Sequence, residues 1–203
     1  MKIFRKYVLF GLIVFLGKIG NSQVQLLDSL QLDSVIPITS LAEALQNPDA
    51  VIKLELRKQK YKTFPTAILK FKNLQYLDLS KNSIKNLPDS IELLTNLQYL
   101  NVSRNSLESV NKNIGKLLNL RYVNFNNNDL ESLPPQIGYL ENLQVLDLWS
   151  NNLDDFPETL ANLKNLKVMD LRVILISDEM QAKIAARVPW ATVYFSPSCK
   201  CRW

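Results

Sequence analysis

A phrase of 23 residues recurs in strict register along this chain, and the period constrains the fold more than any other feature. Five copies open with a leucine, at Leu74, Leu97, Leu120, Leu143 and Leu166. A fixed period of this length is typical of solenoids, in which one unit cannot bury its apolar face alone and must stack on its neighbours. The sequence therefore predicts a stack of about six short units.

The second copy reads Leu74-Gln-Tyr-Leu77-Asp-Leu79-Ser-Lys-Asn82-Ser-Ile84. The same positions recur as Leu97, Leu100, Val102, Asn105 and Leu107, as Leu120, Val123, Phe125, Asn128 and Leu130, and as Leu143, Leu146, Leu148, Asn151 and Leu153. A degenerate copy starts at Val51, and the pattern ends at Ile174. This phrase resembles the leucine-rich repeat signature L-x-x-L-x-L-x-x-N-x-L.

The second half of each unit contains Leu-Pro-x-x-Ile, as at Leu87-Pro88 with Ile91. A proline suits the first position of a short helical turn, where its missing N–H has no partner to lose. Alternation of leucines in the first half predicts a strand with one apolar face. The resemblance to the Leu-Pro-x-x-Ile subclass implies an α/β solenoid. It is a short curved horseshoe with a parallel sheet on the concave face, helical turns on the convex face and a cap at each end.

One asparagine recurs in each of four units, at Asn82, Asn105, Asn128 and Asn151. A buried amide is costly unless its donors and acceptors are paired. We expect a structural ladder in which these side chains bond the backbone of neighbouring turns. A catalytic or ligand-binding role is the less favoured interpretation.

Residues 1–22 are typical of an export signal. Three basic residues precede an apolar run over 7–16, and small residues at Gly20 and Ser22 precede Gln23, as signal cleavage requires. An uncleaved anchor is the alternative, although the run is shorter than the ~20 apolar residues that span a bilayer. We expect an exported protein, periplasmic or secreted and bacterial in the style of its signal, that meets the membrane only through this segment before cleavage.

The basic charge of the chain belongs mainly to that segment. The chain has 24 Lys and Arg against 19 Asp and Glu, and residues 1–22 contribute four of the cations and no acid. The balance of the remainder is 20 against 19. No nucleic-acid partner is therefore expected.

The predicted domain boundaries follow the repeat. Residues 23–50 form an N-terminal linker and a capping helix that opens at Ser40, and about six repeats occupy 51–173. Residues 174–203 form a C-terminal cap, with a helix from Ser177 or Asp178 through Arg187, a strand over 191–195 and a Cys-x-Cys tail. Such caps keep the last apolar layer and the sheet edge from water.

Cys199 and Cys201 are the only cysteines. A bridge between them is strained, because disulfides favour Cα atoms about 5.5 Å apart in a compatible orientation. Three interpretations stay open: an inert tail, a disulfide within or between chains, and a metal site. Metal is the least favoured, because zinc takes four ligands and the chain has no histidine.

The composition argues against catalysis. Absence of histidine excludes Ser-His-Asp and Cys-His arrangements. Downstream of residue 22 the only glycines, Gly115 and Gly138, do not form a phosphate-binding loop. We therefore expect no enzyme and no cofactor or metal. A Ser-Lys or carboxylate-pair enzyme is the remaining catalytic alternative, but the repeats enclose no cleft for it.

Aligned copies turn the outward strand positions into columns on the concave face. The third position reads Lys53, Tyr76, Tyr99, Tyr122, Val145 and Val168. The fifth reads Glu55, Asp78, Asn101, Asn124, Asp147 and Asp170. The seventh reads Arg57, Ser80, Ser103, Asn126, Trp149 and Arg172, and the eighth Lys58, Lys81, Arg104, Asn127, Ser150 and Val173.

Tyrosine and tryptophan are enriched in interfaces because they present a large apolar area with a polar group. The sequence predicts a concave surface that binds an unidentified protein. Its apolar anchors are Tyr76, Tyr99, Tyr122 and Trp149, and its polar selectors are Asp78, Asp147, Arg104 and Arg172. Structural interpretations compete: the tyrosines are a stacked repeat consensus, and Trp149 packs against Arg172 in a cation–π contact. Polysaccharide binding and self-association through the strand near Phe195 or the cysteines are the functional alternatives.

Overall fold

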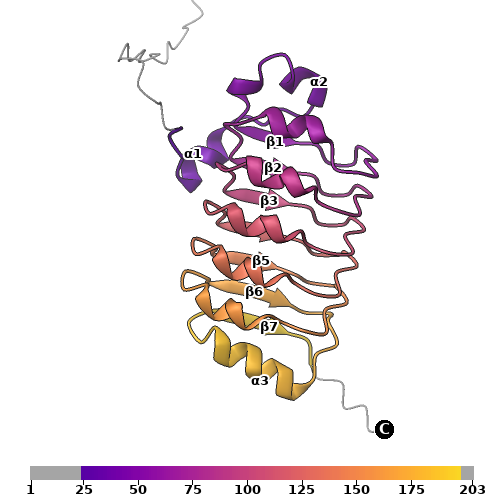
Figure 1. The fold of residues 1–203 in the computed structure, drawn as a ribbon, viewed down its shortest axis with the longest axis vertical. Coiled ribbons are helices and arrows are strands. Elements are labelled where there is room, and N and C mark those ends of the chain that lie inside the picture. The colour runs from indigo at the N-terminus through magenta and orange to yellow at the C-terminus, as the bar shows by residue number, and fades with distance from the viewer. Residues whose placement is uncertain (1–23, 198–203) are drawn as a thin grey trace, which may run out of the picture.

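The computed structural model describes residues 24–197 as a stack of repeats with a sheet on one side and short helices on the other (Figure 1). One parallel sheet runs in chain order through β1 (Lys53–Glu55), β2 (Tyr76–Asp78), β3 (Tyr99–Asn101), β4 (Tyr122–Asn124), β5 (Val145–Asp147), β6 (Val168–Leu171) and β7 (Thr192–Phe195). Neighbouring repeats pair in equivalent register, so that Tyr76 lies beside Tyr99 and Tyr99 beside Tyr122. The predicted parallel-sheet solenoid is confirmed.

Short 3-10 helices cover the other face of the stack. They are η1 (Pro48–Ala50), η2 (Thr66–Lys70), η3 (Asp89–Leu93), η4 (Lys112–Lys116), η5 (Pro135–Tyr139) and η6 (Glu158–Asn162). The repeat prolines lie one residue earlier than predicted, because Pro88 and Pro134 are N-caps with extended backbone at φ −72° and −67°. Proline still costs no hydrogen bond there, since the N-cap N–H lies outside the helical ladder.

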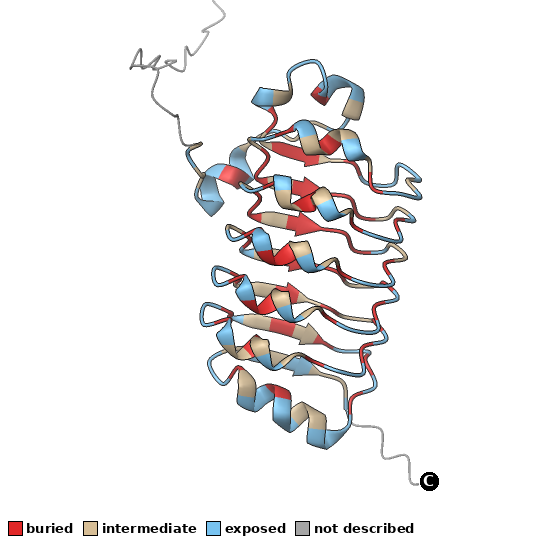
Figure 2. Ribbon diagram, viewed as in Figure 1, coloured by how far each residue is buried: buried red, intermediate tan, exposed pale blue. Residues whose placement is uncertain are grey.

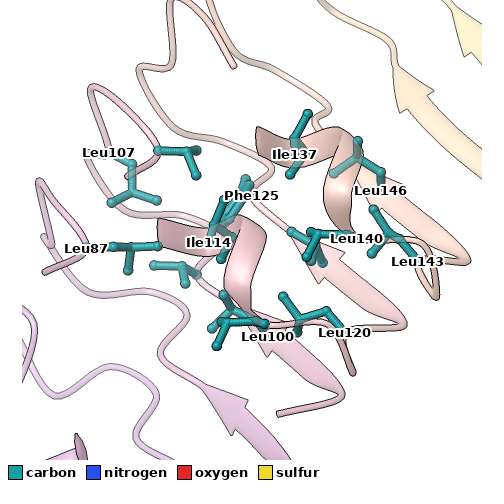
Figure 3. Packing of buried hydrophobic residues seen from close by; sticks show 14 of the residues in the cluster. Leu87, Leu100, Leu107, Ile114, Leu120, Phe125, Ile137, Leu140, Leu143 and Leu146 are labelled. Carbon is teal, nitrogen blue, oxygen red and sulfur yellow. The ribbon is translucent and has the colours of Figure 1, made fainter. Parts of the chain in front are cut away.

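The core is a continuous apolar column between the two layers (Figure 2). Leu100, Ile114, Leu120, Phe125 and Ile137 converge from strands, turns and helices of successive repeats, and each is fully buried (Figure 3). Full burial of such a side chain contributes about 1.5–3 kcal/mol. Stacking therefore supplies the stability that no single repeat has.

Two glycines let the helices of the later repeats approach closely. A β-carbon on Gly115 would collide with the backbone carbonyl of Gln136, and one on Gly138 with that of Thr159. Both glycines are buried between neighbouring 3-10 helices. Their role is packing on the convex side, which the sequence did not assign.

The N-terminal region contains a helix that the sequence did not predict. Residues Ser29–Ser34 form α1, capped by Asp28, whose carboxylate accepts the N–H of Gln31 at 2.9 Å while the Gln31 side chain accepts the N–H of Asp28 at 3.0 Å. The predicted helix after Ser40 is α2 (Leu41–Ala44), which ends before Gln46. The reciprocal capping box thus occurs at Asp28, in the stretch that looked like a linker.

The C-terminal end follows the prediction closely. Helix α3 (Asp178–Arg187) has Ser177 as its N-cap and buries Ile184, and β7 pairs in parallel with β6. The indole N–H of Trp190 donates to the carbonyl of Leu163 at 2.9 Å and joins this end to the last repeat. In residues 24–197 no helix has both the length and the apolar character needed to cross a bilayer.

Candidate binding surface

Three tyrosines form a stack across the outer face of β2, β3 and β4. The ring centroids of Tyr76 and Tyr99 are 4.0 Å apart, those of Tyr99 and Tyr122 are 4.4 Å apart, and each pair is within 4° of parallel. The ammonium of Lys53 lies 4.7 Å from the Tyr76 ring centroid, at one end of the stack. At the other end Val145 follows in register, so the stack ends at Tyr122.

The segment before α1 is fastened to the strand border beside this stack. The Leu27 N–H donates to Oε1 of Gln75 at 2.8 Å, and the Leu27 carbonyl accepts from Nε2 of Gln98 at 2.9 Å. The two glutamine side chains are also joined to each other at 2.8 Å, and both residues are buried. No local pattern predicts these bonds, because Gln75 and Gln98 lie 48 and 71 residues from Leu27 in the sequence.

Helix α1 lies beside the first repeats, at the border where β1 to β3 begin (Figure 1). Leu32 is only 6 % exposed, and the Lys53 ammonium donates to the carbonyls of Leu32 and Asp33, both at 3.4 Å. Cations are favoured at a helix C-terminus because its last carbonyls are unpaired. A gap of about 100 Å³ remains beside the stack, lined by Ser29, Leu32, Asp33, Gln98, Tyr99, Arg121 and Tyr122.

Burial changes the acid–base properties of two of the tyrosines. Burial raises the pKa of Tyr76 to about 12, and burial together with the neighbouring phenols raises the pKa of Tyr99 further. Both phenols are therefore neutral at physiological pH. Lys53 and Tyr99 flank the ring of Tyr76, and Tyr76 and Tyr122 flank the ring of Tyr99. Tyr122 has an aromatic neighbour on one side only, because Val145 follows it in the sheet.

The fifth strand position has a structural role that sequence reasoning missed. In five repeats its side-chain oxygen accepts the backbone N–H two residues later, at 2.7 to 3.1 Å, at Asp78, Asn101, Asn124, Asp147 and Asp170. Such Asx turns stabilise the chain where it leaves a strand. The recurrence of Asp and Asn, and of no other residue, at this position from the second copy onward was the available signal.

Asp78 corrects one of the predicted site residues. It is 2 % exposed, accepts the Ser80 N–H at 2.7 Å and the Asn101 amide at 3.2 Å, and lies 3.6 Å from the Arg57 guanidinium. The expectation that it faces a partner as a polar selector is wrong, because its carboxylate is enclosed by neighbouring repeats. Its second role is to hold Arg57 against the sheet.

The surface over β5, β6 and β7 is composed differently. Asp170 and Arg172 form a two-pronged pair, with Nε to Oδ1 at 3.0 Å and Nη2 to Oδ2 at 2.6 Å. The guanidinium lies 5.5 Å from the ring centroid of Tyr194. The predicted packing of Trp149 against Arg172 is not among the cation–π contacts of residues 24–197, because Arg172 turns to β7 instead.

The pKa values of the two acids on this surface are shifted in opposite directions. Burial raises the pKa of Asp147, although Asn126 donates to its Oδ2 at 2.7 Å. Burial also acts on Asp170, but hydrogen bonds from Arg172 and its positive charge together outweigh it and hold the pKa of Asp170 below its usual value. Asp147 is half-buried and forms no ion pair within residues 24–197, so its charge is less well compensated than that of Asp170.

The asparagine ladder serves the backbone. Asn128 donates to the carbonyls of Val102 and Phe125 at 3.0 and 2.8 Å, and its Oδ1 accepts the Leu107 N–H at 2.9 Å. The same pattern of bonds to the preceding repeat occurs at Asn82, Asn105 and Asn151. Each amide thereby fastens one turn to the next.

A second asparagine column was missed. The residue before the leading leucine of five repeats donates to a carbonyl 24 residues earlier, at 2.6 to 2.9 Å, at Asn73, Asn96, Asn119, Asn142 and Asn165. The recurring Asn-Leu dipeptide was its signal. Both columns are structural, so they leave the outward strand positions as the candidates for recognition.

The remaining predicted residues fall in two places. Arg104 is exposed and follows β3 at a left-handed φ of 53°. Residues 1–22, Cys199 and Cys201 lie outside the described residues. Within residues 24–197 no three His, Cys, Asp or Glu side chains gather as metal ligands. The surface offers aromatic faces, a half-buried acid and paired charges on an open sheet, an arrangement suited to binding.

Comparisons with known proteins agree with this geometry. A family profile described as "Leucine rich repeat" matches residues 50–107, and one described as "Leucine-rich repeat region" matches residues 104–181. Among curated proteins none matches significantly. A solved leucine-rich repeat protein of Leptospira interrogans is 33% identical with a TM-score of 0.65, over 81% of this chain and 47% of that one.

Two further structures are similar. Internalin C2 from Listeria monocytogenes is 26% identical with a TM-score of 0.64, over 79% of this chain and 67% of that one. The ectodomain of the plant membrane receptor kinase GASSHO1/SCHENGEN3 from Arabidopsis thaliana, in complex with CASPARIAN STRIP INTEGRITY FACTOR 2, is 26% identical with a TM-score of 0.62. This match covers 74% of our chain and 18% of the ectodomain, so the chain spans less than half of both the plant and the Leptospira proteins.

The two profile matches together cover residues 50–181, which contain β1 to β6 and both asparagine columns. The register of the sheet and the solved structures point to the same family. The chain belongs to the leucine-rich repeat proteins.

Proposed function

We propose that the chain is an exported, non-catalytic module that binds another protein through the uncovered part of its concave sheet face. We call this part the open face and define it by Tyr122, Val145, Trp149, Val168 and Tyr194, with Asp147 and Arg172 as its charged groups. It leaves out Tyr76 and Tyr99, whose rings are flanked by side chains on both faces, and Asp78, which is buried between repeats.

The environment of Trp149 is the observation that carries the proposal. The other described tryptophan, Trp190, has structural contacts: its indole N–H donates to Leu163, and the Lys164 ammonium lies 4.1 Å from its ring centroid. Trp149 has its backbone N–H bonded to Asp147, but its indole N–H donates to no residue in 24–197. Trp149 is partly buried and its indole N–H has no hydrogen-bond partner in residues 24–197; tryptophan is a residue type enriched at interface hot spots.

Related structures support a protein or peptide partner. The plant ectodomain is solved in complex with an integrity factor, and a plant peptide hormone receptor with 28% identity and a TM-score of 0.59 is in complex with RGF2. These complexes concern those proteins, and fold alone does not fix function. They support the choice of a polypeptide over a small molecule as the partner.

Export rests on the sequence of residues 1–22, with basic residues, an apolar run and small residues before Gln23. Localisation in the periplasm or medium follows from it. N-terminal sequencing of the protein recovered from its source tests this part: a first residue of Gln23 is expected, and recovery with Met1 intact in a membrane fraction contradicts it.

The binding surface is tested by placing a photoreactive phenylalanine at one position of the exported protein. Trp149 is replaced in one variant, and Tyr139 on η5, which is 53% exposed on the helix side, in the matched control. Both variants are irradiated in the envelope and secreted fractions of the source. We expect a protein adduct from position 149 and none from position 139.

The other outcomes are informative. Equal adducts from both positions contradict the choice of the sheet face. An adduct of carbohydrate alone at position 149 favours the polysaccharide alternative, and an adduct with a second copy of the chain favours self-association. Adducts are compared only between variants whose circular dichroism matches the wild type, so misfolding does not imitate loss of binding.

A further inference from the structure

The first repeat is strongly basic. Residues 51–73 contain seven cations and a single acid, Glu55; the cations are Lys53, Arg57, Lys58, Lys60, Lys62, Lys70 and Lys72. The sequence downstream of residue 22 is nearly neutral, so this charge is a local concentration. It continues along the eighth strand position through Lys81 and Arg104.

Three of these cations stand in a row on one border of the sheet. Lys58, Lys81 and Arg104 occupy the turn after β1, β2 and β3, and the backbone N–H of each donates to the next repeat, at 3.2, 2.9 and 2.8 Å. Because neighbouring strands are ~4.8 Å apart, the row is about 10 Å long. The same position is neutral in the next three repeats, where Asn127, Ser150 and Val173 stand.

The charge of the row, and not its backbone, distinguishes it from the later repeats. All six residues of this column have left-handed backbone, with φ between 51° and 60°, so the turn belongs to the repeat itself. Like charges face each other, and Lys58 followed by Arg104 lowers the pKa of Lys81. No ion pair of residues 24–197 includes any of the three.

A row of like charges without ion pairs produces a local positive potential that attracts groups of the opposite sign. We infer that Lys58, Lys81 and Arg104 bind an acidic segment of the partner protein, adjacent to the open face. This inference rests on the proposed function and adds the chemistry of the partner. The three residues supply one positive charge in each of three successive repeats. Together they make this border of the sheet positively charged.

The length of the row decides between partners. An extended peptide rises ~3.3 Å per residue, so the row matches about three residues of an acidic segment. A polyanionic glycan or nucleic acid carries charge along its whole length and would be matched by cations in every repeat. The neutral residues of the last three repeats therefore favour a short acidic segment of a protein whose other part occupies the open face.

The test measures binding of an octaglutamate peptide to the exported protein at low and at physiological ionic strength. The row variant carries Lys58→Gln, Lys81→Gln and Arg104→Gln. The control variant carries Lys70→Gln, Lys72→Gln and Lys112→Gln, which removes the same charge from exposed residues around η2 and η4. We expect the row variant to bind at least about tenfold more weakly and the control to bind within about twofold of the wild type, because surface attraction is local at physiological salt.

Three results would overturn the inference: no octaglutamate binding by the wild type at low salt, equal weakening in both variants, or binding of dextran sulfate or oligo-dT through the same row with no binding of octaglutamate. The last result assigns the row to a glycan or a nucleic acid. A Trp149→Ala variant should bind octaglutamate like the wild type. The row can thus be tested separately from the open face, and failure of photocrosslinking at position 149 does not alter this readout.

Discussion

The two halves of this solenoid have the same framework but different surfaces. Over β1 to β3 the outward residues are engaged within the chain: Tyr76 and Tyr99 are stacked, Lys53 is held between a ring and the end of α1, and Asp78 is enclosed. Over β5 to β7 the outward residues include Trp149, whose indole makes no hydrogen bond and no cation–π contact within the described residues. Identical repeat geometry therefore permits a structural surface in one half and a candidate binding surface in the other.

The comparison requires that the framework is equally strong in both halves. We compare Asn105→Ala in the first half with Asn151→Ala in the second, since each side chain makes equivalent bonds to the preceding repeat. Each substitution leaves backbone groups unpaired and should cost about 3 kcal/mol. Urea denaturation measures it, with the exposed Asn152→Ala as control. A loss confined to one half would show that the frameworks differ.

The packing of α1 against the first repeats is tested by substitutions in this helix. Leu32→Ala should lower the free energy of unfolding by about 2 kcal/mol, because it removes the buried contact of this helix. Leu30→Ala, two residues earlier in the same helix and 80% exposed, should change the free energy of unfolding by less than about 0.5 kcal/mol. Similar small effects of both would mean that α1 is not anchored on the sheet.

The raised pKa of Tyr76 predicts that the folded chain loses stability in alkali. The pKa of Tyr76 in the folded chain is about 12, against 10.0 for a free phenol, so the unfolded chain ionises first. This contribution to stability is fully present below pH 10 and is lost as the pH rises towards 12. Denaturation midpoints measured across this range should fall, and less steeply in Tyr76→Phe. A flat profile, or an unchanged slope in the variant, contradicts a buried stack.

The smallest effect is expected at the exposed ion pair of the second half. Arg172→Gln should raise the pKa of Asp170, because the guanidinium supplies the bonds that lower it. The pair stabilises the fold at pH values above the usual pKa of an aspartate. This contribution is lost as the pH falls through the lowered pKa of Asp170. The contribution should be small, since exposed ion pairs are screened by solvent and salt. Carbon-detected titration of Asp170 by NMR would show an unchanged pKa if the pair were absent in solution.

The sequence predicted the periodic part of this molecule well. Strand columns, the structural asparagines and α3 with its Ser177 cap follow from local patterns that repeat or that have capping chemistry. Helix α1 has a capping box at Asp28 and Gln31, but the only helix start predicted in this region was Ser40. Its docking on the sheet was beyond prediction, because it depends on amide bonds between Leu27 and glutamines 48 and 71 residues away.

The candidate site was predicted in part. Column alignment identified the outward positions, but it treated every outward residue as accessible. Accessibility of an outward residue depends on which other parts of the chain lie against the sheet. Helix α1 lies beside the first repeats only. Asp78 was misassigned for a second reason, because an Asx turn draws its carboxylate toward the backbone and the next repeat closes over it.

The contrast between the halves is tested most directly by the stability of two single variants, Tyr99→Ala and Trp149→Ala. Tyr99 lies inside the stack and should cost about 2 kcal/mol when truncated, whereas Trp149 is partly buried but has no stacking, cation–π or side-chain hydrogen-bonding partner in residues 24–197 and should cost about 1 kcal/mol or less. Urea denaturation of both variants beside the wild type gives the answer without a known ligand. Equal losses, or a larger loss for Trp149→Ala, would show that the tryptophan is structural and would remove the basis for the open face.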